Sequence, residues 1–171
     1  MTYPVVNLKE VFLEKYTHTE HPEWQFQRGC GVISLINKHL LVVAHQKLGK
    51  IGLPGGRVEE TETDKDAAKR ELFEETGIVS EVRHIFTTHY EMPERDQFGT
   101  LAIFKVDIPS PIVINREPDQ HMFCGYVHVD YLANSNFKFA VSLEAAIDWL
   151  QRNDTWTSRL ELPSVWEKIK Y

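Results

Sequence analysis

The hydrophobic positions of the chain fall into continuous apolar runs separated by short polar segments. Residues 30–36 and 40–44 are runs rich in valine and isoleucine with three polar residues between them. This pattern predicts two buried strands joined by a short turn. Residues 79–91 predict a further strand, with Val82, Phe86 and Thr88 on one alternation and Ile85 on the other. Residues 101–108 and 122–129 predict two more strands.

Helical patterns interrupt and follow these strands. Residues 63–76 form a segment of helix length, and Gly77 is expected to end it. Ser142 is expected to cap the N-terminus of a second helix. The apolar positions of that helix recur at i, i+3, i+4 and i+7 and are Leu143, Ala146, Ile147 and Leu150. Pro163 is expected to open a last short helix.

Strands combined with a central helix and further helices at the end predict an α/β domain whose sheet is covered by helices. We expect residues 1–171 to form a single domain, with a core over about 29–133 and C-terminal helices over about 142–171. The first 27 residues fit helix and strand equally well. The polar stretch around His18, Glu20 and His21 is interpreted as a loop, with metal binding as the alternative.

The predicted central helix carries an unusual set of carboxylates. A Pro-Gly-Gly turn at residues 54–56 precedes it, and such a turn exposes backbone carbonyl and N–H groups. Glu71, Glu74 and Glu75 are related by i, i+3 and i+4, so they project from one side of a helix. Like charges at this spacing cost about 0.2–0.5 kcal/mol per pair. A divalent cation with oxygen ligands would reverse that cost, whereas a solvated acidic face is the simpler alternative.

The spacing around these glutamates extends over 23 residues. It runs Gly56-x5-Glu62-x7-Arg70-Glu71-Leu72-x-Glu74-Glu75-x-Gly77-Ile78. At every specified position it resembles the signature of the Nudix hydrolases. The resemblance is strong over residues 53–78 and extends plausibly over about 29–133. It implies an α/β/α sandwich around a mixed β-sheet. It also implies metal-dependent hydrolysis of a diphosphate linkage in a nucleoside diphosphate joined to another group.

Carried over position by position, the resemblance implies a metal site. Glu71 and Glu75 are the leading ligands, Glu74 assists them, and the backbone carbonyl of Gly55 is a further ligand. The expected cofactor is Mg²⁺ or Mn²⁺, because both ions suit oxygen ligands.

Three further residues are expected to take part in catalysis. Arg70 and Glu62 are expected to pair with each other or with neighbouring carboxylates and so to orient the site. Many Nudix hydrolases use one more acidic residue from a later loop. Glu117 is the choice here and Asp119 the alternate, while an acidic turn residue without function explains either one nearly as well.

The signature leaves the substrate open. A nucleoside triphosphate or related nucleotide ranks first, because that activity is common in single-domain members of the family. ADP-ribose or a nucleotide sugar is the alternative, since the spacing from Ile78 to Pro93 resembles that branch, although a simple turn explains Pro93 as well. A non-catalytic nucleotide-sensing module is the alternative of another class. Arg28, Tyr90 and His121 are candidate substrate contacts, each with a surface or core explanation.

Composition and charge limit the classes of partner that the protein is expected to bind. The formal net charge of −6 argues against a nucleic-acid-binding surface, which is normally basic. The cysteines, Cys30 and Cys124, are expected to be buried reduced thiols. The sequence contains no 18-residue apolar run and no signal-peptide pattern, so we expect no membrane partner and a cytoplasmic location. Phe73, apolar where a polar residue is expected, suggests contact with a terminal segment or a second subunit, and hence a homodimer.

Overall fold

The structure is a computed structural model that describes residues 25–92, 96–134 and 136–153. Three expectations fall outside these residues. They are the loop around His18, Glu20 and His21, the turn at Pro93, and the short helix opened by Pro163.

The first sheet has four strands in the order β5-β1-β7-β6. Their bounds are β1 Gln25–Ile33, β5 Gly55–Arg57, β6 Val82–Met92 and β7 Gln97–Val106. β1 pairs with β7 in parallel, whereas β1 with β5 and β6 with β7 are antiparallel pairs. The sheet is therefore mixed, as expected.

The second sheet has the order β2-β3-β4-β9, with β8 paired to β3. Its bounds are β2 Leu35–Ile36, β3 His39–His45, β4 Lys50–Gly52, β8 His121–His128 and β9 Lys138–Phe139. It is also mixed, because β4 and β9 run parallel while β3 pairs antiparallel with its neighbours. The single strand predicted over residues 30–36 is thus divided at Ser34 between the two sheets.

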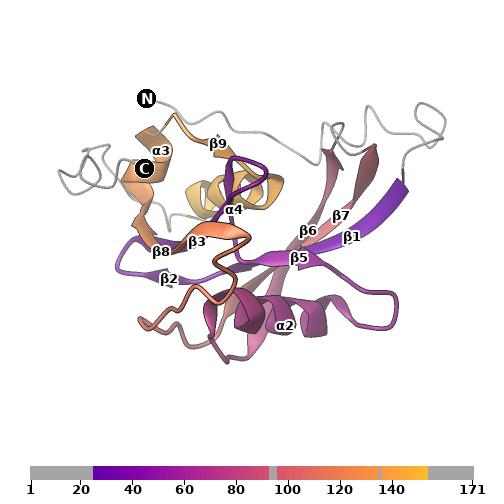
Figure 1. The fold of residues 1–171 in the computed structure, drawn as a ribbon, viewed down its shortest axis with the longest axis horizontal. Coiled ribbons are helices and arrows are strands. Elements are labelled where there is room, and N and C mark those ends of the chain that lie inside the picture. Colours follow the sequence, from indigo (N-terminus) through magenta and orange to yellow (C-terminus); the bar gives the residue numbers. More distant parts are fainter. Residues whose placement is uncertain (1–24, 93–95, 135, 154–171) are drawn as a thin grey trace.

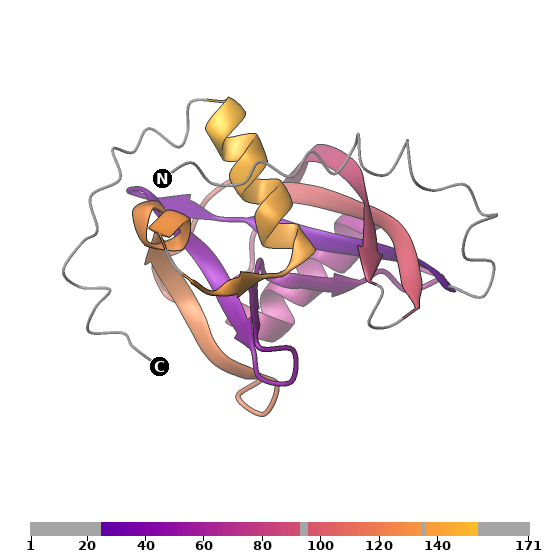
Figure 2. The ribbon, with the colours of Figure 1, turned by 90° about the horizontal axis from the view of Figure 1, so that it is seen from above.

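Helices cover both sides of the first sheet. Figure 1 shows α2 (Asp64–Thr76) on one side and α4 (Val141–Arg152) on the other, and Figure 2 shows α4 lying across the strands. The short α3 (Val129–Asn134) follows β8 directly. One core cluster joins α4 to both sheets and a second joins α2 to the opposite face of the first sheet. The predicted α/β/α arrangement is confirmed.

The predicted central helix is confirmed at both ends. The Thr63 hydroxyl accepts a hydrogen bond from the N–H of Asp66, which satisfies one of the free donors of the first turn. Gly77 adopts a left-handed conformation with φ of 73° and donates its N–H to the carbonyl of Phe73. A glycine suits this position because a side chain would strain that conformation.

The second predicted helix exists, but its expected N-cap is wrong. α4 begins at Val141 after Ala140, and no side chain bonds the first turn. The Ser142 hydroxyl instead accepts a hydrogen bond from the N–H of Leu53 at 3.2 Å. A tertiary contact to the segment before β5 thus takes the place of the local cap.

Strand β6 changes face along its length. Regular alternation predicts that Val82 and Phe86 share one face. Instead Val82 packs in the cluster beneath α2, while Phe86 packs against the cluster beneath α4. The pairing register shifts between His84 and Phe86. Because an extra residue in one strand reverses the faces beyond it, this bulge turns the later part of β6 toward α4.

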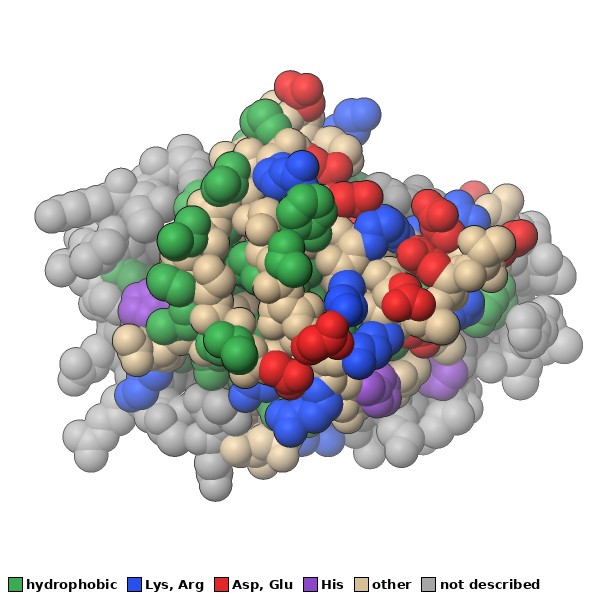
Figure 3. All heavy atoms as spheres, turned by 90° about the horizontal axis from the view of Figure 1, so that it is seen from below, with side chains coloured by type: hydrophobic (Ala, Val, Ile, Leu, Met, Phe, Trp, Pro, Cys, Tyr) green, Lys and Arg blue, Asp and Glu red, His purple; other side chains and the backbone are tan. Residues whose placement is uncertain are grey.

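The outward face of α2 carries acidic and basic side chains side by side (Figure 3). Phe73 lies on this face and is 43% exposed, and the Arg116 guanidinium lies 4.2 Å from the centre of its ring. Its expected contact with a terminal segment or a second subunit stays a prediction. Within the described ranges, no helix combines the length and the apolar character needed to cross a membrane.

The two cysteines are free thiols in different surroundings. Cys30 is buried on β1, as expected, while Cys124 on β8 is only half-buried. Burial raises the pKa of both thiols to about 12. Both side chains therefore stay protonated at neutral pH.

Candidate metal and substrate site

The helix glutamates lie directly against the glycines of β5. Glu75 is only 3% exposed, and its Oε2 accepts a hydrogen bond from the N–H of Gly55 at 2.8 Å. A Cβ atom on Gly56 would lie 2.6 Å from Oε1 of Glu71, so a side chain here would displace this carboxylate. The Gly-Gly turn thus lets backbone and carboxylates approach closely. Whether the Gly55 carbonyl binds a metal stays a prediction.

Arg70 contacts two carboxylates of α2 and one of the loop before it. Its guanidinium lies 2.6 Å from Glu62, 2.7 Å from Glu71 and 3.0 Å from Glu74. The expected pair between Arg70 and Glu62 is therefore present, and the hydrogen bonds from Arg70 lower the pKa of the Glu62 carboxyl. Arg70 holds three carboxylates in place, which suits its predicted orienting role.

The electrostatics of Glu75 fit a cation site. Burial raises the pKa of Glu75 to about 9, with the negative charges of Glu71 and Glu117 adding to the effect against the Gly55 hydrogen bond. Burial also raises the pKa of Glu71. A charged carboxylate in such surroundings is costly unless a positive charge accompanies it. The donor set is therefore one that a divalent cation would complete.

The segment before β8 brings two more residues to Glu75. The carbonyl of Glu117 accepts the N–H groups of Gln120 and His121, which folds this segment into a tight turn. The Nε2 atom of His121 lies 3.3 Å from Oε1 of Glu75, and its Nδ1 lies 3.8 Å from Oε2 of Glu117. Potential ligand atoms of Glu75, Glu117 and His121 lie within 4.8 Å of one another. Burial lowers the pKa of His121, so its ring is neutral at pH 7.

Glu117 and Asp119, the two candidates for the later acid, differ in their surroundings. Glu117 belongs to the cluster with Glu75, whereas Asp119 is exposed. We expect Glu117→Gln to lower kcat/KM by about 10- to 100-fold with little change in Tm, because it removes a charge that faces the site. Asp119→Asn is the matched control and should retain nearly full activity. Equal losses, or the opposite ranking, would exclude Glu117 from this role.

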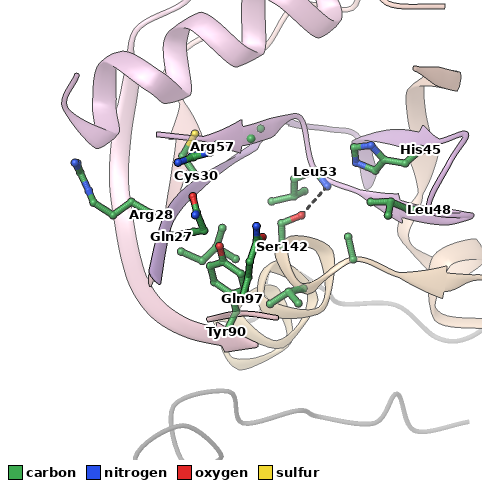
Figure 4. Close-up of a pocket in the computed structure, with 16 residues that line it drawn as sticks. Gln27, Arg28, Cys30, His45, Leu48, Leu53, Arg57, Tyr90, Gln97 and Ser142 are labelled. Atoms are coloured by element: carbon green, nitrogen blue, oxygen red, sulfur yellow. Dashed lines mark hydrogen bonds between the residues drawn. The ribbon is translucent and has the colours of Figure 1, made fainter. Parts of the chain in front are cut away.

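A cavity of about 300 Å³ opens on the other side of β5 (Figure 4). Tyr90 and Arg28 both line it, and their contact with substrate stays a prediction. The Arg28 side chain extends toward α2 and lies 2.5 Å from Asp64. His121 is not among the described residues that line the cavity. Its predicted substrate contact therefore has no support from this geometry, and its neighbours are the carboxylates instead.

Two glutamines that line the cavity, Gln27 and Gln97, were not predicted from the sequence. Gly99 of β7 pairs with Tyr90 on one side and with Gln27 on the other. Gln97 lies two residues before Gly99 and so shares its face. Figure 4 shows Tyr90, Gln27 and Gln97 close together on one side of the cavity. A Cβ atom on Gly99 would lie 1.7 Å from the carbonyl oxygen of Gln27, so the glycine allows the backbones of β1 and β7 to approach closely here. No local sequence signal marks that arrangement.

Comparison with known proteins decides the family. The family profile of the NUDIX domain matches residues 25–150, which includes both sheets and most of α4. The chain belongs to the Nudix family. This Nudix domain therefore extends beyond the core expected over residues 29–133.

Similar proteins of known sequence cover part of the chain. It is 34% identical over 105 residues to a protein named ADP-ribose pyrophosphatase from Methanocaldococcus jannaschii, covering 59% of this chain and 60% of that protein. It is 32% identical over 88 residues to a protein named RNA pyrophosphohydrolase from Erythrobacter litoralis, covering 46% of this chain and 53% of that protein. The chain thus spans little more than half the length of either relative.

Solved structures agree with the fold. The MutT Nudix hydrolase from Burkholderia pseudomallei is 23% identical, with a TM-score of 0.64, and the match covers 72% of this chain and 97% of that one. A MutT protein from Methanosarcina mazei gives a TM-score of 0.66 at 18% identity, covering 77% of this chain and 97% of that one. At this level of identity the likeness concerns the fold alone.

Proposed function

We propose that this Nudix protein is a hydrolase that cleaves a diphosphate linkage in a nucleotide, most favourably a nucleoside triphosphate, with Mg²⁺ or Mn²⁺ as cofactor. The observation that carries the proposal is the position of β5. Its glycines contact the carboxylates of Glu71 and Glu75 on one side and line the 300 Å³ cavity on the other. A diphosphate can then reach the carboxylates while its nucleoside occupies the cavity.

The chain supplies the parts that such a reaction needs. A divalent cation held by the helix glutamates would neutralise phosphate charge and lower the pKa of a bound water. Arg70 keeps Glu71 and Glu74 fixed during the reaction. Water attacks one phosphorus of the P–O–P linkage, and that phosphorus keeps the oxygen of the water. The other phosphate group leaves with the bridging oxygen.

The cavity supports a substrate with one nucleoside. Its volume of about 300 Å³ is at the lower end of the range for small-molecule sites, roughly 300–1,000 Å³. The Tyr90 ring offers a face for stacking on a base. The amides of Gln27 and Gln97 each provide a donor and an acceptor for its polar edge. These features suit a base attached to a phosphate chain.

ADP-ribose or a nucleotide sugar is the second candidate. The relative from Methanocaldococcus jannaschii is named ADP-ribose pyrophosphatase. The Nudix domain of Shewanella oneidensis NrtR, similar in fold with a TM-score of 0.61, has a structure in complex with ADP-ribose. In this case the adenosine would occupy the cavity and the second ribose would lie outside it.

A substrate panel tests the proposal. Nucleoside triphosphates, ADP-ribose and nucleotide sugars would each be incubated with the protein and Mg²⁺ or Mn²⁺, and the products separated by chromatography. We expect the highest kcat/KM for a nucleoside triphosphate, with a nucleoside monophosphate and pyrophosphate, or a diphosphate and phosphate, as products. Preference for ADP-ribose would favour the second candidate. Tight binding without any turnover would instead indicate a nucleotide-sensing module.

A further inference from the structure

The imidazole of His121 is buried among carboxylates with one nitrogen unused. The side chain is 2% exposed, and Nδ1 has no hydrogen-bond partner among the described residues. Its other nitrogen, Nε2, faces Glu75 at 3.3 Å. A buried polar atom without a partner is costly, so its presence points to a ligand that completes it.

The atom that Nδ1 faces shows what kind of ligand this is. Oε2 of Glu117 lies 3.8 Å away, too far for a hydrogen bond. Two donors at this separation can both reach one ion placed between them, since metal–nitrogen and metal–oxygen bonds measure about 2.0–2.2 Å. The lone pair on Nδ1 and the carboxylate of Glu117 both attract a cation, whereas neither group can donate a hydrogen bond to the other.

We propose that His121 is a ligand of the cation held by Glu75 and Glu117, so that the site contains nitrogen as well as oxygen. With bonds of about 2.0–2.2 Å, one ion can contact two atoms up to about 4.4 Å apart, and the 3.8 Å between Nδ1 of His121 and Oε2 of Glu117 lies within that limit, with Glu75 beside the same ring. His121 follows Glu117 by four residues, and the turn between them brings both side chains to Glu75.

A nitrogen ligand changes which ion the site prefers. Mg²⁺ is a hard ion that favours oxygen ligands and retains its waters. Imidazole favours transition-metal ions, and affinity generally rises from Mn²⁺ through Co²⁺. We therefore expect this site to bind Co²⁺ more tightly than Mn²⁺, and Mn²⁺ more tightly than Mg²⁺. The inference concerns the metal site of the proposed function but does not require turnover.

The test compares metal affinities without any substrate. Dissociation constants for Mg²⁺ and Co²⁺ would be measured by calorimetric titration of the wild type and of His121→Gln, whose amide oxygen can still approach an ion. We expect Co²⁺ affinity to fall about tenfold or more and Mg²⁺ affinity to change less than about threefold. His84→Gln is the matched control, because His84 is exposed on β6 and its Nε2 is hydrogen-bonded to the hydroxyl of Thr87. It should change neither constant.

Other outcomes would overturn the proposal. Equal losses for both ions would mean that His121 only positions Glu75, and unchanged constants would mean that it does not act on the ion. If His121→Gln fails to fold, pulsed electron paramagnetic resonance of Mn²⁺ bound to the wild type decides. Coupling to a directly bound ¹⁴N supports ligation, and its absence excludes it. If the wild type hydrolysed no substrate of the panel, the metal-binding results would be unaffected. The two proposals can therefore fail separately.

Discussion

Replacing Glu75 with glutamine should lower kcat/KM about a thousandfold while the protein remains folded. The substitution keeps the side-chain volume but removes the charge of the most buried carboxylate in the cluster. Stabilisation by a metal ion is worth several kcal/mol in such reactions, and each 1.36 kcal/mol is a factor of ten in rate. Steady-state kinetics on the best substrate of the panel, at saturating metal, would measure the loss.

The same substitution should change how stability depends on pH. The pKa of Glu75 rises from 4.5 to about 9 on folding, so between these values the folded chain holds a proton that the unfolded chain has released. The free energy of unfolding of the metal-free protein then falls as pH rises, by up to about 1.4 kcal/mol per pH unit. Glu75→Gln should remove this slope in urea unfolding followed from pH 5 to 8.

Glu60→Gln provides the control for both measurements. Glu60 is exposed and lies before α2, outside the carboxylate cluster. It should keep the wild-type rate and the wild-type slope. Near wild-type turnover of Glu75→Gln at saturating metal would remove Glu75 from the metal ligands.

Removing divalent cations should abolish activity almost completely, to less than about a thousandth of the full rate. In the absence of a cation, nothing beside these carboxylates would neutralise the phosphate charge of the substrate or lower the pKa of the attacking water. Turnover would be measured in excess EDTA and again after adding Mg²⁺ or Mn²⁺ beyond the chelator. Restored activity completes the expected result, whereas full turnover in EDTA would refute the metal assignment.

Unfolding experiments provide an independent measure of the same cation. An ion that binds only the folded protein at 100 times its dissociation constant stabilises it by about 2.7 kcal/mol. The rise in Tm on adding Mg²⁺ should be larger at pH 8 than at pH 6, because the ion and the proton compete for Glu75. Glu75→Gln should show a smaller rise at both pH values.

The parts of the fold that were predictable depend on local chemistry. Thr63 and Gly77 mark the ends of α2 because a hydroxyl cap and a left-handed glycine act within one turn of the helix. The pair between Arg70 and Glu62 was also expected, since both positions belong to one contiguous motif. The glutamate face of α2 follows directly from helical periodicity.

The parts that could not be predicted depend on partners distant in sequence. The reversal of β6 after Ile85 requires the pairing with β7, because a bulge is defined only relative to the opposite strand. Ser142 bonds Leu53, which is 89 residues away, instead of capping its own helix. His121 meets Glu75 only once β8 has paired with β3, so its place among the carboxylates could not be predicted from local pattern.

Strand β5 separates two groups of residues that can change independently during evolution. Glu71 and Glu75 contact its glycines from the side of α2, whereas Tyr90 and Gln97 belong to the cavity on the opposite side. Substitutions in the cavity wall can therefore accumulate without disturbing the carboxylates. The glycine turn itself tolerates no such change, because a Cβ atom on Gly55 would lie 2.1 Å from the backbone carbonyl oxygen of Cys30, and one on Gly56 would displace the carboxylate of Glu71. Directed evolution toward a new nucleotide should accordingly vary β6, β7 and the start of α4 and leave β5 unchanged.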